Sequence, residues 1–291
     1  MQEFEDPFEN GYGHVNLEAN FMAQILRRYP QRGTPILEKA FDLRLMLSRI
    51  LSQVNRAAAL SPPIRKVLIL GVEVPSQPEF MAHLKATLPI SRHSVRFGVK
   101  STEARPKFDN LNDLLVEHLK PDVDWLIITD DDIAIPPNFL DVFIFLLEHF
   151  EFKLGQPAHK LGSYASYLIT RRNWATLARQ TNFVEIGPLV ALHRDTFPDL
   201  IPFPQVGMGW GLDYHWALLA KAKGWRVGII DALPIQHLRP VGSGYGSNIA
   251  LINAKRFLDA HGGLKPAAAL TTVAVHRSLG RRCKPNRITS V

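Results

Sequence analysis

The feature that most constrains the fold of this chain is a short apolar run that ends in three consecutive carboxylates. Residues 125–133 read Trp-Leu-Ile-Ile-Thr-Asp-Asp-Asp-Ile. The run is continuous and rich in β-branched residues, which predicts a buried strand that delivers acidic groups to its carboxyl end. In open α/β sheets, ligands bind at that edge. The motif therefore predicts an α/β sheet with an acidic ligand site at residues 130–132.

The spacing of the three aspartates favours a metal site. Adjacent carboxylates repel one another and raise each other's pKa, and a hard divalent cation with oxygen ligands removes that repulsion. In an extended segment, residues two apart point the same way, so Asp130 and Asp132 converge on one ion while Asp131 faces elsewhere. The alternative is a solvated acidic turn that caps the helix expected after Pro136 and Pro137.

Length and composition set the limits of this interpretation. The 291 residues suffice for one large α/β domain with appendages or for two small domains. The longest apolar stretch, at residues 139–147, is too short to span a bilayer, and residues 1–20 lack the pattern of a signal peptide. The single cysteine, Cys283, excludes an internal disulfide framework and a multi-cysteine zinc site. We therefore expect a cytoplasmic protein.

The positive charge of the chain is concentrated near its end. The formal net charge is +7, and five basic residues crowd the last fifteen positions: Arg277, Arg281, Arg282, Lys284 and Arg287. Two interpretations stay open, a solvated end or a contact with anionic lipid that would place the protein on the inner face of a membrane. We expect no nucleic-acid partner, because aromatic and basic residues do not interleave along a recognisable platform.

Two helices are expected before the sheet, at residues 15–29 and from Thr34 onward. The second opens with a cap residue followed by proline, and its apolar stripe predicts a packing surface. This stripe consists of Ile36, Ala40, Leu43, Leu47, Ile50 and Val54. A proline break follows at residues 61–63. We therefore expect an N-terminal helical extension at 1–60, a catalytic domain at 61–262 and a basic tail at 263–291.

Strands and helices alternate after this break. Strands are predicted at 67–72, 94–100 and 125–130, with helices at 79–87 and 111–119 between them. This order predicts a nucleotide-binding type of half-sheet whose crevice lies near Asp130. Residues 71–75 match neither the dinucleotide nor the P-loop pattern. In the second half, strands are predicted at 163–170, 183–192 and 224–231, and a helix at 214–223.

Residues 207–216 form a second candidate site. This segment contains several glycines, Trp210 and a carboxylate at the start of a predicted helix. Together they predict a binding surface for a polar, ring-shaped ligand. Asp213 is stable there as an anion, although it also has a simpler interpretation as the cap of the helix. Further on, His237 and Arg239 lie in a predicted loop. His237 either completes the ligands of a metal or is structural.

These motifs together resemble a glycosyltransferase of the GT-A fold. The resemblance rests on the strand that ends Thr-Asp-Asp-Asp-Ile, on Gly-Trp-Gly-Leu-Asp at 209–213, and on a later strand and His237. Segments 155–158, 183–188 and 209–213 are similar to the little-characterised DUF707-like group and to family 2-like glycosyltransferases. The resemblance covers residues 66–241. It implies a Rossmann-like mixed sheet flanked by helices, preceded by a helical extension.

The resemblance also implies an activity, that of a hexosyltransferase. In such enzymes an Asp-x-Asp motif holds Mn²⁺ or Mg²⁺ against the diphosphate of a nucleotide sugar, and a late histidine joins the ligands. The metal ligands here would be Asp130, Asp132 and His237. The sugar would pass to a hydroxyl-bearing glycan, lipid or small molecule. This sequence departs from galactosyltransferase-like relatives, which carry an acidic pair after Gly-Trp-Gly, because only Asp213 follows Leu212.

The chemistry of such a transfer suggests roles for further residues. An inverting enzyme needs a carboxylate that removes the acceptor proton, and Asp213 is the candidate base. A retaining enzyme does not, and Glu185 could then lie closer to the reacting face. We interpret residues 242–246 either as a lid that closes over the nucleotide or as a flexible exit loop. The expected donor-binding residues are Asp130, Asp131, Lys107, Arg239, Trp210 and Gly211.

Two other classes of function remain open. A phosphohydrolase of the haloacid dehalogenase type also places Asp-x-Asp after an apolar strand, with its first aspartate as nucleophile. Such enzymes usually carry Thr or Val where this chain has Ala134, and their motif usually lies on the first strand. The third class is a non-catalytic protein that binds carbohydrate or nucleotide sugar. The sequence leaves open the donor sugar, the base, the acceptor and the stereochemical outcome.

Overall fold

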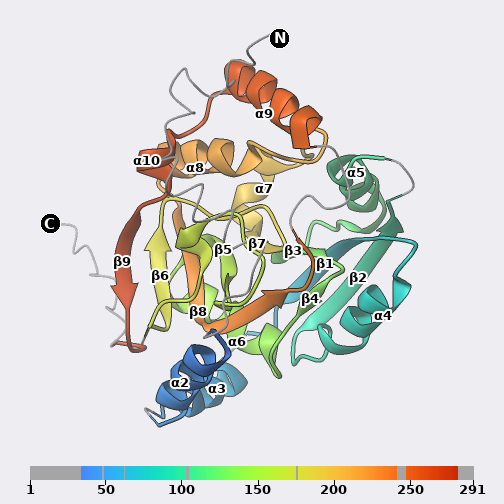
Figure 1. Ribbon diagram of the computed structural model, residues 1–291. Coiled ribbons are helices and arrows are strands. Elements are labelled where there is room, and N and C mark those ends of the chain that lie inside the picture. The colour runs from blue at the N-terminus through green and yellow to red at the C-terminus, as the bar shows by residue number, and fades with distance from the viewer. Residues whose placement is uncertain are drawn as a thin grey trace, which may run out of the picture.

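The computed structural model describes residues 34–47, 49–61, 63–102, 105–174, 176–240 and 247–280. Its centre is a mixed sheet with the strand order β2-β1-β3-β7-β5-β8-β6-β9, and the short strand β4 pairs with β8 (Figure 1). The strands are β1 (Lys66–Glu73), β2 (Ser94–Ser101), β3 (Trp125–Asp130), β4 (Ile133–Ala134), β5 (Phe152–His159), β6 (Ala178–Thr181), β7 (Leu189–His193), β8 (Arg226–His237) and β9 (Thr272–His276).

Helices surround this sheet. They are α2 (Thr34–Leu47), α3 (Ile50–Leu60), α4 (Pro78–Thr87), α5 (Lys107–His118), α6 (Phe139–His149), α7 (Phe197–Leu200), α8 (Leu212–Lys223), α9 (Ser247–His261) and α10 (Pro266–Ala269). The helix predicted at 15–29 and the lid or loop predicted at 242–246 lie outside the described residues. No helix in the described part of the chain is long and apolar enough to cross a membrane.

The strand directions bring distant parts of the chain to one edge of the sheet. β1 pairs in parallel with β2 and β3, and β5 pairs in parallel with β8. β7 lies antiparallel between β3 and β5, so β3, β5 and β8 all end at the same edge. We call this the carboxyl edge. The segment that enters β7 lies there too, because β7 runs in the opposite direction.

Both faces of the sheet are covered, which explains why its strands are continuously apolar. Val67 and Ile69 of β1 pack in a core shared with α3, α4 and α6. Leu68 and Leu70, which point the other way, pack in a core shared with α5, α8 and α9. A mixed α/β sheet flanked by helices and preceded by a helical extension confirms the predicted fold class.

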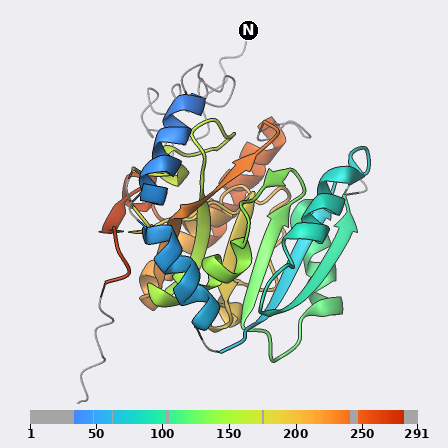
Figure 2. The same ribbon diagram turned by 90° about the horizontal axis from the view of Figure 1, so that it is seen from below.

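The N-terminal extension differs from the single amphipathic helix predicted from Thr34 to Val54. Arg49 has a left-handed backbone, with φ of 54°, and it separates α2 from α3. Val54 is buried, but Ile36 and Leu43 are exposed, so the predicted packing stripe is wrong for α2. Both helices lie outside the sheet (Figures 1 and 2). The stripe failed as a prediction because α2 contacts the rest of the molecule through other side chains, which include Glu38, Phe41 and Asp42.

The attachment of α2 centres on Arg172. Its side chain is only 1% exposed and pairs with Glu38 and Asp42 of α2. Phe41 of the same helix packs edge-to-face on Trp174, with ring centroids 4.5 Å apart. These contacts fix α2 against the segment between β5 and β6.

The second half of the sheet shows most of the differences from the sequence prediction. Residues 163–170 form a turn and a short 3₁₀ helix, Leu168–Thr170, and not a strand. The strand predicted at 183–192 is confined to β7. The strand predicted at 224–231 continues to His237, which therefore ends a strand and does not lie in a loop. Part of the range assigned to a basic tail belongs to the sheet, because β9 pairs with β6.

Candidate functional site

Three side chains at the carboxyl edge could hold a metal ion. Asp130 ends β3, Asp132 lies between β3 and β4, and His237 ends β8. The pairing of β4 with β8 sets Ile133 opposite His237, and the Leu238 N–H donates to the Asp132 carbonyl at 2.9 Å. One ligand atom from each of the three side chains lies within 4.8 Å of the others. The structure thus brings together the three residues predicted as metal ligands, which we call the metal trio.

The donor atoms of the metal trio fit a divalent cation. Asp132 Oδ1 lies 3.2 Å from His237 Nε2. His237 Nδ1 is buried and has no hydrogen-bond partner. Two carboxylates and one imidazole suit Mn²⁺, and carboxylates with substrate phosphates suit Mg²⁺. Three protein ligands also leave coordination positions for substrate oxygens.

Arg239 lies against the acidic cluster on the side of β1. Its Nε donates to Asp132 Oδ2 at 2.9 Å, and its Nη2 pairs with Asp131. Nη1 donates to Gln77 at 3.2 Å. Asp131 also accepts the Val74 N–H at 2.9 Å, which ties the end of β3 to the segment after β1. Asp131 is therefore turned away from the metal trio, and Arg239 is committed to the two carboxylates.

Burial and charge act in opposite directions on this cluster. Burial alone would raise the pKa of Asp132, but His237 and Arg239 outweigh it and hold that pKa well below its usual range. Burial would lower the pKa of His237, but Asp132 outweighs it and raises that pKa. For Asp131, burial dominates and raises the pKa despite the Val74 N–H and Arg239. Asp132 is therefore an anion at neutral pH and is available as a ligand.

Lys107 approaches the metal trio from another element. It is the first residue of α5, and its Nζ forms an ion pair with Asp130 Oδ1. The backbone before β7 crosses close by, since the Asp130 N–H donates to the Pro188 carbonyl at 2.7 Å. A Cβ atom at Gly187 would lie only 3.1 Å from Asp130 Oδ2. The absence of a side chain at Gly187 leaves room around this carboxylate.

Asp213 is a buried carboxyl group in the first turn of α8. Its Oδ2 accepts the Tyr167 hydroxyl at 3.2 Å, and its Oδ1 accepts the Tyr214 N–H at 3.0 Å. Burial raises the pKa of Asp213 to about 7, and the negative charge of Glu185 adds to the effect. A carboxyl group that titrates near neutral pH has the property required of a general base.

Glu185 interacts electrostatically with both Asp213 and His237. It is buried, accepts the Ser166 N–H at 3.2 Å, and its Oε2 lies 3.5 Å from His159 Nε2. His159 Nδ1 lies 3.1 Å from Ser163 Oγ, which in turn accepts the His237 N–H at 2.8 Å. A row of polar groups therefore joins Glu185 to the backbone of His237.

Glu185 and Asp213 carry opposite pKa shifts. Burial would raise the pKa of Glu185, but His159 and the Ser166 N–H outweigh it and lower that pKa. Glu185 is thus an anion at neutral pH, while Asp213 exchanges its proton there. Two carboxyl groups whose environments separate their pKa values are a common basis for different acid and base roles.

The glycines around Trp210 have a packing role. Gly209 and Gly211 have φ values of 91° and 96°, a left-handed region that favours glycine. A Cβ atom at Gly209 would lie 2.0 Å from the Phe108 ring, and one at Gly211 would lie 3.3 Å from Leu258. The turn therefore fits closely against α5 and α9. Trp210 is half-buried in this turn, and its predicted contact with a ligand stays a prediction.

The sequence did not predict His159, Ser163 or Tyr167. Ser163 and Tyr167 fall in the segment wrongly predicted as a strand, and His159 ends β5, for which no strand was predicted. Tyr167 is placed by packing, because its ring lies 4.7 Å from that of Phe183. Contacts of this kind join residues far apart in sequence and leave no local pattern.

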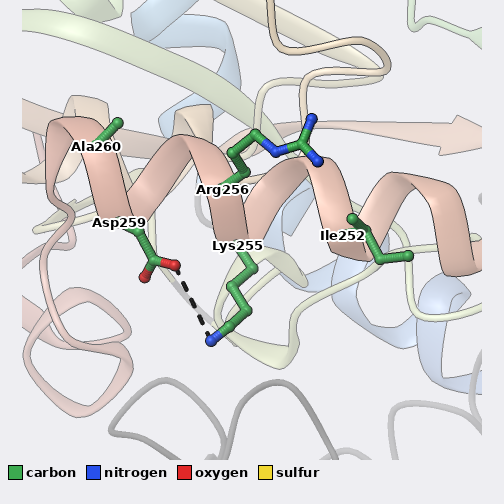
Figure 3. Close-up of a pocket in the computed structure, with 5 residues that line it drawn as sticks. All are labelled: Ile252, Lys255, Arg256, Asp259 and Ala260. Carbon is green, nitrogen blue, oxygen red and sulfur yellow. Dashed lines mark ion pairs between the residues drawn. The ribbon is translucent and has the colours of Figure 1, made fainter.

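One pocket of the surface lies away from these residues. Figure 3 shows its lining side chains on a single helix, α9, where Lys255 and Asp259 approach to 4.0 Å. The lining residues are Ile252, Lys255, Arg256, Asp259 and Ala260. None of them was predicted as a site residue, and we assign the pocket no function.

Comparisons with known proteins give no family. No family model matches the sequence, and no curated protein matches it. Solved structures do match, and they include the following three. A197 from STIV is 13% identical, with a TM-score of 0.36, and the match covers 60% of this chain and 86% of that chain. The mannosyltransferase PcManGT from Pyrobaculum calidifontis, in complex with GDP-Man and Mn²⁺, is 16% identical, with a TM-score of 0.48 and coverage of 79% and 78%.

The third structure is GalNAc-T7 with UDP, GalNAc and Mn²⁺, which is 9% identical, with a TM-score of 0.45. That match covers 68% of this chain and 48% of GalNAc-T7. All three TM-scores lie below 0.5, so none of these similarities decides the activity of this chain. The assignment of the site rests on its own geometry.

Proposed function

We propose that this protein is a metal-dependent glycosyltransferase of the hexosyltransferase type, which moves a sugar from a nucleoside-diphosphate donor to a hydroxyl acceptor. The observation that carries the proposal is the convergence of Asp130, Asp132 and His237 within 4.8 Å. Asp213 is a buried carboxyl group with a pKa of about 7, and it interacts electrostatically with the Glu185 anion. His237 interacts electrostatically with the same anion. The GT-A resemblance of the motifs supports this interpretation, and the narrower DUF707-like resemblance stays a prediction.

On the donor side, the metal trio would hold Mn²⁺ or Mg²⁺. When bound, such an ion supplies Lewis-acid stabilisation of the charge that develops on the leaving diphosphate. Arg239 was predicted as a phosphate ligand. We assign it instead to holding Asp131 and Asp132 in place, because its guanidinium already pairs with both. Lys107 remains the candidate for contact with the phosphates.

On the acceptor side, we assign the general base to Asp213. It would take the proton of the acceptor hydroxyl in an inverting transfer, while Tyr167 holds the carboxylate in position. Glu185 is held as an anion by His159 and keeps Asp213 basic through its charge. A retaining transfer would not require this proton step, so the stereochemistry of the product tests the assignment directly.

The first experiment is a calorimetric titration of UDP and of GDP into the protein, with Mn²⁺ and then with EDTA. We expect Mn²⁺-dependent binding of one diphosphate to the wild type and none to Asp132→Asn. Asp122→Asn is the matched control, because it removes the same charge from an exposed side chain outside the candidate site. Failure of both diphosphates to bind with any divalent metal would contradict the proposal.

A second experiment separates the alternatives. A glycosyltransferase moves the sugar of a nucleotide sugar to an acceptor hydroxyl, or slowly to water, and releases the nucleoside diphosphate. A phosphohydrolase of the haloacid dehalogenase type would instead release inorganic phosphate from small phosphate esters, and a binding protein would turn over neither. We expect diphosphate release that requires Mn²⁺ or Mg²⁺ and is lost in Asp132→Asn.

A further inference from the structure

The position of Lys107 is electrostatically unusual. As the first residue of α5 it lies at the helix end where a positive charge is unfavourable. Its ion pair with Asp130 offsets that cost, and the two side chains are only 14% and 29% exposed. The lysine therefore supplies a positive charge to the metal trio from α5, a helix that packs on β1 and β2.

The two cations of the cluster are held differently. Arg239 is fixed by Asp131, Asp132 and Gln77, and its planar fork matches the carboxylates. Lys107 is a point charge on a flexible stem that meets Asp130. The backbone at Gly187 lies close to this pair, since a Cβ atom there would lie 3.1 Å from Asp130 Oδ2 and 3.5 Å from Lys107 Nζ. Lys107 is therefore the cation of the pair of basic residues that can leave its carboxylate by rotation of its own side chain.

We propose that Lys107 is an exchangeable counter-ion of Asp130, displaced when a divalent metal binds, and that its released ammonium then contacts the diphosphate of the donor. The inference rests on the proposed function and deepens it. Lys107 neutralises the carboxylate before the metal arrives. After the exchange, the same charge lies beside the anionic part of the substrate, at the positive end of α5.

This role has opposite consequences for the two ligands. Lys107 competes with a metal ion for Asp130, so its removal strengthens the binding of the metal alone. It attracts the diphosphate, so its removal weakens the binding of the nucleotide in saturating metal. A purely structural ion pair would weaken both kinds of binding when it is removed. A simple phosphate ligand would leave the binding of the metal alone unchanged.

The test is a titration of Mn²⁺ without nucleotide into the wild type, Lys107→Met and Lys66→Met. Lys66 is the matched control, because it pairs with Asp122 and begins β1 at the opposite edge of the sheet. We expect Lys107→Met to bind Mn²⁺ about tenfold more tightly, within the usual range of coupling between paired residues. UDP or GDP in saturating Mn²⁺ should bind it about tenfold more weakly.

Two variants guard against a folding defect. Lys107→Arg keeps the charge and should change both affinities less than Lys107→Met does, and Lys107→Gln replaces the methionine variant if that protein does not fold. The inference is overturned if the wild type binds Mn²⁺ and a diphosphate but Lys107→Met or Lys107→Gln binds Mn²⁺ no more tightly than the wild type does. That outcome would leave the proposed function intact. Failure of the wild type to bind either ligand would overturn both.

Discussion

Burial of Asp213 links the stability of the protein to pH. The pKa of Asp213 is about 7 in the folded protein, against 3.8 for an ordinary aspartate. The folded state therefore binds the proton more tightly than the unfolded state does. The resulting stability is complete below about pH 4 and is lost as the pH rises through 7. The full change is at most about 4 kcal/mol, at 1.36 kcal/mol per pKa unit.

We expect Asp213→Asn to remove this dependence. The free energy of unfolding of the wild type should fall between pH 5 and pH 8, while that of the variant stays flatter. Urea unfolding at both pH values measures the difference, with Asp122→Asn as the exposed control. Parallel pH profiles for the wild type and Asp213→Asn would show that Asp213 is not protonated in the folded state near pH 6.

The activity should depend on the same ionisation. If Asp213 is the general base, kcat/KM for sugar transfer should rise with pH to a plateau above about 7, and Asp213→Asn should lose on the order of 10²- to 10⁴-fold. Glu185→Gln should keep the plateau but move the rise to lower pH, because the charge of Glu185 raises the pKa of Asp213. A pH profile that Glu185→Gln leaves unmoved would contradict this coupling.

At the scale of residues, the sequence could predict the charged groups that follow strong strand patterns. Asp130 and Asp132 were found because an apolar run ends in them, and His237 because it follows another such run. The hydrogen-bond partners that hold His237 and Asp213 in place were not predictable. Ser163 reaches His237 from a turn, and Tyr167 reaches Asp213 from a separate segment.

At the scale of elements, α2 is held in place by one buried guanidinium. Arg172 pairs with Glu38, which is 14% exposed, and with Asp42, which is 62% exposed. Removal of one partner of a buried pair costs several kcal/mol, whereas an exposed pair contributes little. Since Asp42 still faces Arg172, we expect Glu38→Ala to lower the free energy of unfolding by about 2 kcal/mol.

Asp42→Ala is the matched control and should cost less than about 0.5 kcal/mol. Urea unfolding of the two variants measures both values. Equal losses would mean that burial does not distinguish the two carboxylates. α2 would then be held mainly by the packing of Phe41 on Trp174.

The predicted elements share a common physical basis. β1, β2 and β3 carry apolar or β-branched runs long enough to be recognised, and α4, α5 and α8 lie where the sequence predicted helices. β6 has the polar sequence Ala-Arg-Gln-Thr, which is compatible with burial because Arg179 pairs with Asp231 of β8 at 2.9 Å. A strand whose buried charge is balanced by a distant residue cannot be recognised from its own sequence.

At the scale of the whole molecule, the metal trio joins the two halves of the sheet. β3 provides Asp130 and belongs to the parallel half with β1 and β2, whereas β8 provides His237 and lies beyond β7 and β5. A ligand that binds all three residues of the trio binds only when both halves are folded and paired. Such a ligand stabilises the native state of the whole chain, and not only a local segment.

We therefore expect Mn²⁺ with the matching nucleoside diphosphate to raise the melting temperature. At 100 times the dissociation constant the ligand adds about 2.7 kcal/mol, and each kcal/mol shifts the Tm of a domain of this size by about 2–4 °C. Calorimetric melting should show a shift of about 5–10 °C in the wild type and none in Asp132→Asn. Lys107→Met should gain more than the wild type from Mn²⁺ alone and less from the diphosphate. A shift that persists in Asp132→Asn would place the ligand elsewhere on the molecule.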